Sequence, residues 1–228
     1  MSMKKVLGVL TLCFSFFLVL AQDSEVRSVG SFTGVKVGEA IDVYLKKGDK
    51  ESVKVEVTGA RVSDVLTEVS GSYLKIHMRD GRYRNRNVKV YITYVSLEKI
   101  HASSASNVFS EGAIRANSMD ISASSAASVE ITIEAGFASI DASSAGDLVL
   151  EGKARELAIE VSSAGEVDAY SLESEIVRAN ASSAGSAKIS VSKELNAHAS
   201  SGGSIRFRGS PAKTNTDSSS GGSVKKSN

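Results

Sequence analysis

A six-residue motif that returns through the second half of the chain limits the possible folds more than any other feature. Its clearest copies contain Ser-Ser-Ala-Gly, at residues 143–146, 162–165 and 182–185. The first serine of each pair is residue 103, 124, 143, 162, 182, 200 or 219, which gives steps of 21, 19, 19, 20, 18 and 19 residues. A repeat of about 20 residues is typical of solenoids and other stacked arrays.

Apolar and polar residues alternate on both sides of each motif, as in segments 129–133 and 157–161. This period of two indicates strands with one buried face. The hairpin signals Asn-Gly and Asp-Gly are missing from the repeats. We therefore predict an all-β fold, a single-stranded parallel β-helix with coils of about 20 residues. Each coil would contain a strand, a small-residue corner, a second strand and a return such as 151–155, and the rule for parallel crossovers favours a right-handed coil.

The serine pairs are expected at the corners of the coils. A sharp corner leaves little room inside, which suits Ser, Ala and Gly, and serine hydroxyls can bond to nearby backbone groups. The pairs are then either corners of a scaffold or a stacked hydroxyl ladder that binds sugar or another repetitive surface. The serines concerned are Ser103, Ser104, Ser124, Ser125, Ser143, Ser144, Ser162, Ser163, Ser182, Ser183, Ser200 and Ser201.

Residues 1–21 have the pattern of a secretory signal peptide. Two lysines precede an apolar run, and Ala21 suits cleavage before Gln22. The run is short for a membrane span, so we expect no transmembrane helix. Cys13 lies within this run and raises lipidation as an alternative. Removal of the signal peptide would leave a mature chain with no cysteine, and therefore no disulfide. We expect an exported protein, in the periplasm, on the outer-membrane surface or secreted.

Residues 22–228 are predicted to form one β-helix domain. Residues 101–224 carry the regular repeats, whereas residues 29–100 are less regular and would begin or cap the solenoid, because an open coil exposes unpaired backbone groups. Segment Arg61–Ser70 is expected to be a short helix or an irregular strand. The strands expected before the repeats are Phe32–Val37, Ala40–Lys46, Ser52–Thr58, Tyr73–Arg79, Asn87–Thr93 and Leu97–Ala102.

The charge of the chain is nearly balanced. It has 27 basic and 26 acidic residues, and loss of the two signal-peptide lysines leaves 25 against 26. This argues against a nucleic-acid partner held by global attraction. The densest basic segment, 79–89, is either a solvated loop that prevents edge pairing or a grip for an acidic glycan, lipopolysaccharide phosphates or nucleic acid. Its candidate ligand-binding residues are Arg79, Arg82, Tyr83, Arg84, Arg86 and Lys89.

The sequence offers little for catalysis. No His-x-x-x-His, cysteine pair or nucleophile-elbow pattern occurs. His101 and His198 hold equivalent positions five coils apart, roughly 24 Å, and with His77 they are expected to be exposed strand residues. We expect no catalytic residue and no cofactor.

Four carboxylates form the best acidic constellation. Asp141 would stack beside Glu160, and Asp147 beside Glu166, on adjacent coils. Such a cluster could bind Ca²⁺ through its oxygen atoms or act as paired acids on a glycosidic bond. Alternating acids on a solvent-facing strand are the simpler interpretation.

Several segments resemble a bacterial family described as putative auto-transporter adhesin, head GIN domain. They are the opening strands Phe32–Val37 and Ala40–Leu45, the repeated small-residue corner, and Phe207–Pro211. The family's corner is usually Ser-Gly-Ser-Gly, whereas this chain has Ser-Ser-Ala-Gly. The resemblance covers about residues 29–224 and implies an exported β-helical adhesin of Gram-negative bacteria.

We predict a non-catalytic, adhesin-like binding module that presents a repetitive face to a glycan, an envelope polymer or an envelope protein. One alternative is a carbohydrate-active enzyme, a hydrolase or lyase, that uses the four clustered carboxylates. Another is a structural envelope protein that self-associates end to end. The sequence does not indicate the oligomeric state.

Overall fold

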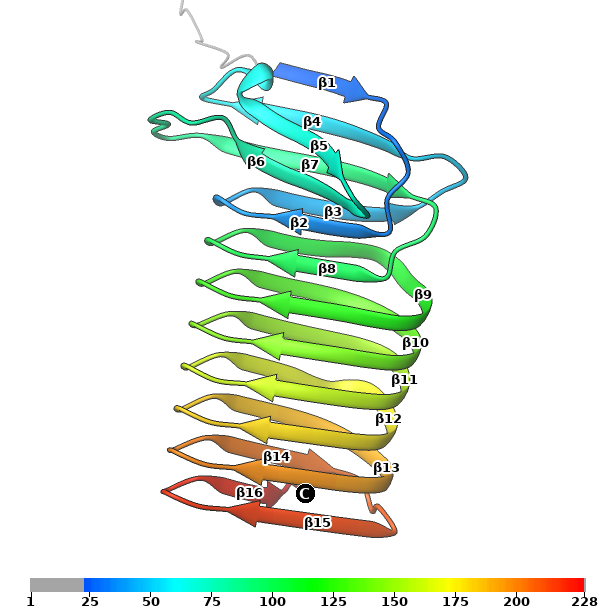
Figure 1. The fold of residues 1–228 in the computed structure, drawn as a ribbon, viewed down its shortest axis with the longest axis vertical. Helices are drawn as coiled ribbons and strands as arrows, with labels where there is room; N and C mark the ends of the chain where they lie inside the picture. The colour runs from blue at the N-terminus through cyan, green and yellow to red at the C-terminus, as the bar shows by residue number, and fades with distance from the viewer. Residues whose placement is uncertain (1–22, 228) are drawn as a thin grey trace, which may run out of the picture.

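The computed structural model describes residues 23–227, which form a tall stack of two-layered coils (Figure 1). Apart from one turn of 3₁₀-helix, η1 (Val62–Asp64), the regular elements are strands. The strands are β1 (Asp23–Arg27), β2 (Gly34–Val37), β3 (Asp42–Lys47), β4 (Ser52–Thr58), β5 (Val65–Ser70), β6 (Tyr73–Met78), β7 (Asn87–Tyr94), β8 (Lys99–Ala102), β9 (Asn107–Ala123), β10 (Ser128–Ala142), β11 (Asp147–Val161), β12 (Glu166–Ala181), β13 (Ser186–Ala199), β14 (Ser204–Arg208), β15 (Lys213–Ser218) and β16 (Ser223–Lys226).

Strand register confirms the predicted parallel β-helix. Ala123 lies opposite Ala142, Ala142 opposite Val161, and Val161 opposite Ala181, all in parallel pairs. These partners are 19, 19 and 20 residues apart (142 − 123, 161 − 142, 181 − 161), the same steps that separate the serine pairs. Each repeat in the sequence therefore forms one coil of the solenoid.

The long strands β9 to β13 run through both layers of the stack, so the predicted return segment is part of a strand. β11, for example, continues from Asp147 to Val161 and bends at the edge opposite the corners. Gly152 has a φ of +103°, and the register with β12 shifts between Val149 and Glu151. A bulge of this kind bends a strand without ending it.

Small and branched aliphatic side chains fill the space between the layers. Ile100, Ile121, Ile140 and Ile159 stack in successive coils, and each is at most 1% exposed. Full burial of such a side chain stabilises the fold by ~1.5–3 kcal/mol. Next to the corners the inward residues are smaller, as in Ala142, because the layers converge there.

The first half of the chain builds a cap whose coils are stacked out of sequence order. β2 pairs with both β6 and β8, and β3 pairs with both β7 and β9. The coil formed by β2 and β3 therefore lies between the β6–β7 coil and the β8–β9 coil. Antiparallel strands finish this end, with β4 on β7, β1 on β4, and β5 on β6.

The strands expected in this half are confirmed to within about two residues at each end. Segment Arg61–Ser70 contains both expected forms, since η1 is followed directly by β5.

The other end of the stack is a polar coil. Leu195 and Ala197 are buried in β13, and their register partners in β15 are Thr214 and Thr216. All six residues of β15 are exposed. Terminal repeats of solenoids commonly have such a polar outer face, because no further coil covers them.

Within residues 23–227, the structure contains no helix long and apolar enough to cross a membrane. The predicted signal peptide, 1–21, lies outside the described residues.

Candidate functional site

Each corner is a four-residue turn whose two central residues have positive φ. Ser144 and Ala145 have φ values of 50° and 59°, and the Gly146 N–H donates to the Ser143 carbonyl oxygen at 2.8 Å. Two successive positive φ values define the type I′ pattern, which glycine and asparagine usually supply. For other residues this region costs ~1–2 kcal/mol each.

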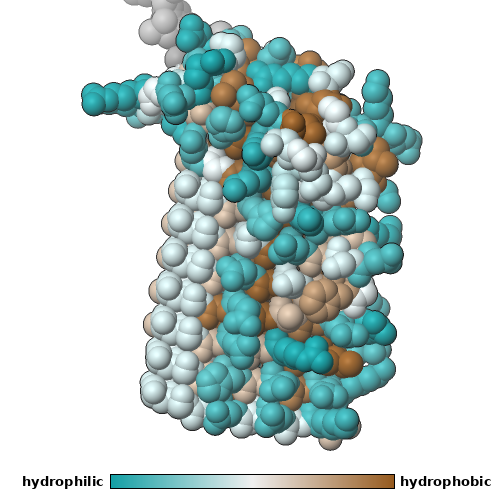
Figure 2. Space-filling model, viewed as in Figure 1, coloured by the Kyte–Doolittle hydropathy of each residue, from teal (hydrophilic) through white to brown (hydrophobic). Residues whose placement is uncertain are grey.

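Backbone hydrogen bonds between coils offset this cost. Ala145 N–H donates to the Ser163 carbonyl oxygen, and Ala164 N–H to the Ser183 carbonyl oxygen, both at 3.1 Å. The predicted corner serines all lie in such turns. Within residues 23–227, no hydrogen bond joins the hydroxyl of one corner to that of the next. The corners therefore stack through their backbone, and their hydroxyls line one edge as a pale column in Figure 2.

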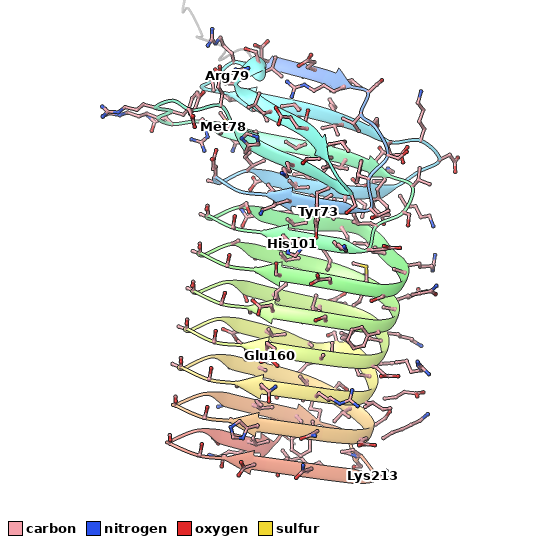
Figure 3. All side chains as sticks on the ribbon, viewed as in Figure 1. Tyr73, Met78, Arg79, His101, Glu160 and Lys213 are labelled. Atoms are coloured by element: carbon pink, nitrogen blue, oxygen red, sulfur yellow. The ribbon has the colours of Figure 1, made fainter. Side chains whose placement is uncertain are left out.

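The predicted basic segment forms the loop between β6 and β7. In this coil the loop takes the place of the four-residue corner, and it projects beyond the corner column (Figures 1 and 2). Arg79 stands at its base (Figure 3). Chain topology thus puts the densest basic segment at one edge of the cap.

Two residues anchor this loop. The Arg86 guanidinium donates to the Glu39 carbonyl oxygen and lies 5.4 Å from the centre of the Tyr83 ring. The Glu39 carboxylate accepts the Met78 N–H at 2.8 Å. Glu39 belongs to the corner of the β2–β3 coil, so the loop is fixed against that corner.

The other predicted ligand-binding residues separate into two groups. Arg79, Arg82 and Arg84 are exposed, and in the described part of the chain their side chains form no ion pair or hydrogen bond. Lys89 lies away from the loop on β7, where Asp42 is its partner in register. Three arginines of the segment are therefore available to a ligand.

Two lysines that sequence reasoning missed extend the basic surface. Lys75 on β6 and Lys36 on β2 are partners in register. Together with His77 and Ser104 they line a cavity of about 230 Å³ beside the corner. The two lysines are distant in the sequence and meet only because the cap coils stack out of order. No sequence signal could have paired them.

A hydrogen-bonded chain of three side chains crosses the same face. The Tyr73 hydroxyl lies 3.0 Å from His101 Nε2, and His101 Nδ1 contacts the Ser122 hydroxyl. Figure 3 shows Tyr73 and His101 close together. Burial lowers the pKa of His101, an effect that Asp120 opposes. The expectation that this histidine is simply exposed is therefore wrong, because Tyr73 covers it.

The acidic constellation forms two pairs on opposite faces. Asp141 is the register partner of Glu160 near the ends of β10 and β11, whereas Asp147 and Glu166 begin β11 and β12 after the corner. Partial burial raises the pKa of Asp141, and Glu160 raises it further. Partial burial and then Glu166 raise the pKa of Asp147.

The two carboxylate pairs do not combine into one cluster of four. Lys188 bonds to both Glu166 and Asp168, at 2.9 and 3.2 Å, and the Asn180 amide donates to Glu160 at 2.7 Å. Among residues 23–227, no group of three or more His, Cys, Asp or Glu side chains is placed to hold a metal ion. A calcium site at these residues stays a prediction.

A row of aromatic rings on the second face was also missed. Tyr91, Tyr44 and Phe109 stack with ring centres 5.1 and 5.4 Å apart, and the Lys54 ammonium lies 5.6 Å from the Tyr91 ring. Because the rings cover one another's faces, they stabilise neighbouring strands and present their edges to solvent.

The family comparison agrees with this architecture. The sequence profile of the family described as "Putative auto-transporter adhesin, head GIN domain" matches residues 31–211. The chain belongs to this family. The resemblance seen in the opening strands and corners is thereby confirmed, and the family's description indicates a surface or exported protein. The comparison with curated proteins found no match.

Solved structures of similar fold come from species of Bacteroides and Parabacteroides. A putative adhesin from Bacteroides fragilis has a TM-score of 0.81 at 19% identity, covering 91% of this chain and 97% of the other. A putative adhesin from Parabacteroides distasonis has a TM-score of 0.72 at 20% identity, with the same coverage. A protein described as a putative lipid binding protein, from the same species, has a TM-score of 0.70 at 17% identity and again the same coverage. At these identities the likeness shows the fold.

Proposed function

We propose that this protein is an exported, non-catalytic binding module that holds an extended partner, a glycan or another envelope polymer, along its solenoid. One observation carries the proposal. Outward residues of successive coils form straight columns, such as His101, Ser122, Asp141, Glu160 and Asn180. Neighbouring strands are ~4.8 Å apart, so each column repeats its contacts at a fixed spacing. Weak contacts in register add up when one chain engages many of them.

The family assignment supports this proposal, because the family's description is "Putative auto-transporter adhesin". Export is supported by the pattern of residues 1–21. The cavities give weaker support to a small-molecule enzyme. A cavity of about 710 Å³ lies on the bent edge, and its charged lining residues already form ion pairs: Lys153 with Glu173, Arg155 with Glu156, and Glu175 with Lys193.

A glycan array and a polysaccharide pull-down on the chain from Gln22 onward test the proposal. Binding to an extended glycan is expected, and repeating the assay with Ca²⁺ or a chelator tests the carboxylate pairs as a metal site. Absence of binding to every glycan and envelope polymer, with and without Ca²⁺, would contradict the proposal.

The Asp141–Glu160 pair keeps a second candidate function open. Two neighbouring carboxyl groups, one with a raised pKa, are the minimum that a glycosidase needs. This alternative predicts release of reducing sugar from a polysaccharide, lost on Asp141→Asn with Glu160→Gln. Equal release by the wild-type chain and the double variant would eliminate this pair as the site.

A further inference from the structure

Charge is unevenly distributed over the face that carries β6, β2 and β8. One outward column begins with Glu68 on β5, continues with Lys75, Lys36 and His101 in the cap, and reaches Asp141 and Glu160 in the repeats. The whole chain is nearly neutral. The two cap lysines therefore lie side by side because of how the cap coils stack, and not because the chain has an excess of positive charge.

We call the two cavity lysines and the four loop arginines the "basic corner". Its members are Lys36, Lys75, Arg79, Arg82, Arg84 and Arg86. Elsewhere on the solenoid, exposed cations commonly have a carboxylate partner, as Arg115 has in Glu134 and Lys193 has in Glu175. Within residues 23–227, no member of the basic corner forms an ion pair with a carboxylate. Three carboxylates lie nearby: that of Glu39 accepts a backbone N–H, that of Asp64 is paired with Arg61, and Glu68 is the register partner of Lys75.

The basic corner also has a defined shape. Its cavity of about 230 Å³ is bounded by Lys36 and Lys75 on one side and by Ser103 and Ser104 on the other. At ~30 Å³ for each water molecule in the liquid, this space holds a hydrated oxyanion. Arg86 fixes the loop against Glu39, one of the residues that line the cavity, and its Nε atom is buried without a hydrogen-bond partner.

We propose that the basic corner binds sulfate or phosphate groups carried on an extended polysaccharide. The cavity lysines take one anionic group, and the loop arginines take the next groups along the same chain. Guanidinium groups match such oxyanions with paired hydrogen bonds. This inference rests on the proposed binding function and names the chemical class of its partner.

Two other anionic partners fit the surface less well. The large hydrophobic residues that are exposed in the described part of the chain, Val26, Val69, Val95 and Phe137, all lie outside the loop, so the loop has no apolar residue to insert into a membrane. The one aromatic ring of the loop, Tyr83, is occupied by Arg86 and is not free to stack on a nucleic-acid base.

Binding to dextran sulfate, measured against neutral dextran of the same length, tests this proposal on the chain from Gln22 onward. The double variants Arg82→Ala/Arg84→Ala and Lys36→Ala/Lys75→Ala are each expected to weaken binding by about tenfold or more. The matched control is Lys47→Ala/Lys50→Ala, which removes two exposed lysines at the opposite edge of the cap and is expected to change affinity by less than about twofold. Affinity should fall as salt rises.

Each result has a defined meaning. Equal loss in the control variant, or no binding to dextran sulfate, overturns the proposal. Binding to neutral glycans together with failure on dextran sulfate overturns only this inference and leaves the proposed function standing; failure on both overturns both. Binding to vesicles with anionic headgroups is measured separately. If the chain binds these vesicles more tightly than dextran sulfate, and this binding depends on Arg82 and Arg84, the partner is a lipid surface and the polysaccharide proposal is overturned. Unchanged unfolding midpoints of the variants exclude loss of fold.

Discussion

Gly34 shows how the absence of one side chain places several others. It lies in β2 between Tyr73 and Lys99, and a Cβ atom there would come within 2.6 Å of the Tyr73 ring. The ring therefore lies across the glycine and reaches His101, one coil beyond β2. The hydrogen-bonded chain from Tyr73 to Ser122 depends on this space.

Replacing Gly34 with Ala should displace the Tyr73 ring and lower the free energy of unfolding by ~1–3 kcal/mol, the usual cost of overpacking. Urea unfolding measures the change. Gly30→Ala is the control, because a Cβ at Gly30 meets nothing within 4 Å. Equal effects of the two substitutions would mean that Tyr73 does not need this space.

Asp141 gives a prediction for pH. Its pKa is raised above the ordinary 3.8 by partial burial and then by Glu160, so the folded state holds the proton more tightly than the unfolded state. The charged form therefore costs stability, and this cost appears as pH rises through the folded-state pKa. Asp141→Asn should stabilise the protein at pH 7 by about 0.5 kcal/mol, a surface-scale effect, and by nothing at pH 3.

Urea unfolding at the two pH values tests this expectation, with Asp49→Asn in an exposed turn as control. A gain that is larger at pH 3 than at pH 7 would contradict the assigned direction of the shift.

At the scale of the element, the corner turn decides how the strands stack. Ala164 has a φ of 59°, and a Cβ at Gly165 would lie 2.6 Å from the Ala142 carbonyl oxygen. Glycine in place of Ala164 would adopt this positive φ at a lower energetic cost. At Gly165, any side chain would collide with the neighbouring coil. In the first two repeat corners, Ser106 and Ala127 hold the position that corresponds to Gly165. In the later corners this position is always glycine.

Substitutions at one corner should therefore act in opposite directions. Ala164→Gly should raise the free energy of unfolding by up to ~1 kcal/mol, because it removes the cost of positive φ. Gly165→Ala should lower it by ~1–3 kcal/mol through the contact with the neighbouring coil. Ala158→Gly, in the second half of β11, is the control for added chain flexibility and should destabilise. The same sign for both corner variants would refute the assigned turn geometry.

The sequence predicted the corners but not their conformation. Small residues at a fixed spacing were enough to place them, since spacing determines which residues stack. The type I′ geometry was hidden because Ser and Ala rarely adopt it, and only neighbouring coils make it favourable. Gly202 and Gly221, at the second central position of the last two corners, were the available signal.

At the scale of the whole molecule, the repeat determined the regular part and said little about the ends. Alternation in the first half placed the strands correctly, yet it could not show that β2 lies between β6 and β8. For the same reason the basic loop was found in the sequence, whereas its neighbours Lys36 and Lys75 were not. Pairings between distant segments leave no local pattern.

The polar end coil predicts that the chain from Gln22 onward remains monomeric. Thr214 and Thr216 occupy positions that are aliphatic in the preceding coil, so an end-to-end contact would bury hydroxyl groups. Sedimentation velocity should show one species at all concentrations. The double variant Thr214→Val/Thr216→Val should self-associate. Concentration-dependent oligomers of the wild-type chain would instead favour the self-associating envelope protein.

The out-of-order cap has a consequence for how the chain folds. Val37 pairs with Ala102, a separation of 65 residues (102 − 37), whereas coils β10 to β12 close over about 19 residues. Closing the longer loop costs about 1 kcal/mol more in chain entropy, and neither β2 nor β3 can complete its pairs until later strands are in place. Assembly should therefore nucleate in the middle repeats and spread in both directions. The arginine loop, although encoded early in the chain, would reach its final position among the last parts of the molecule.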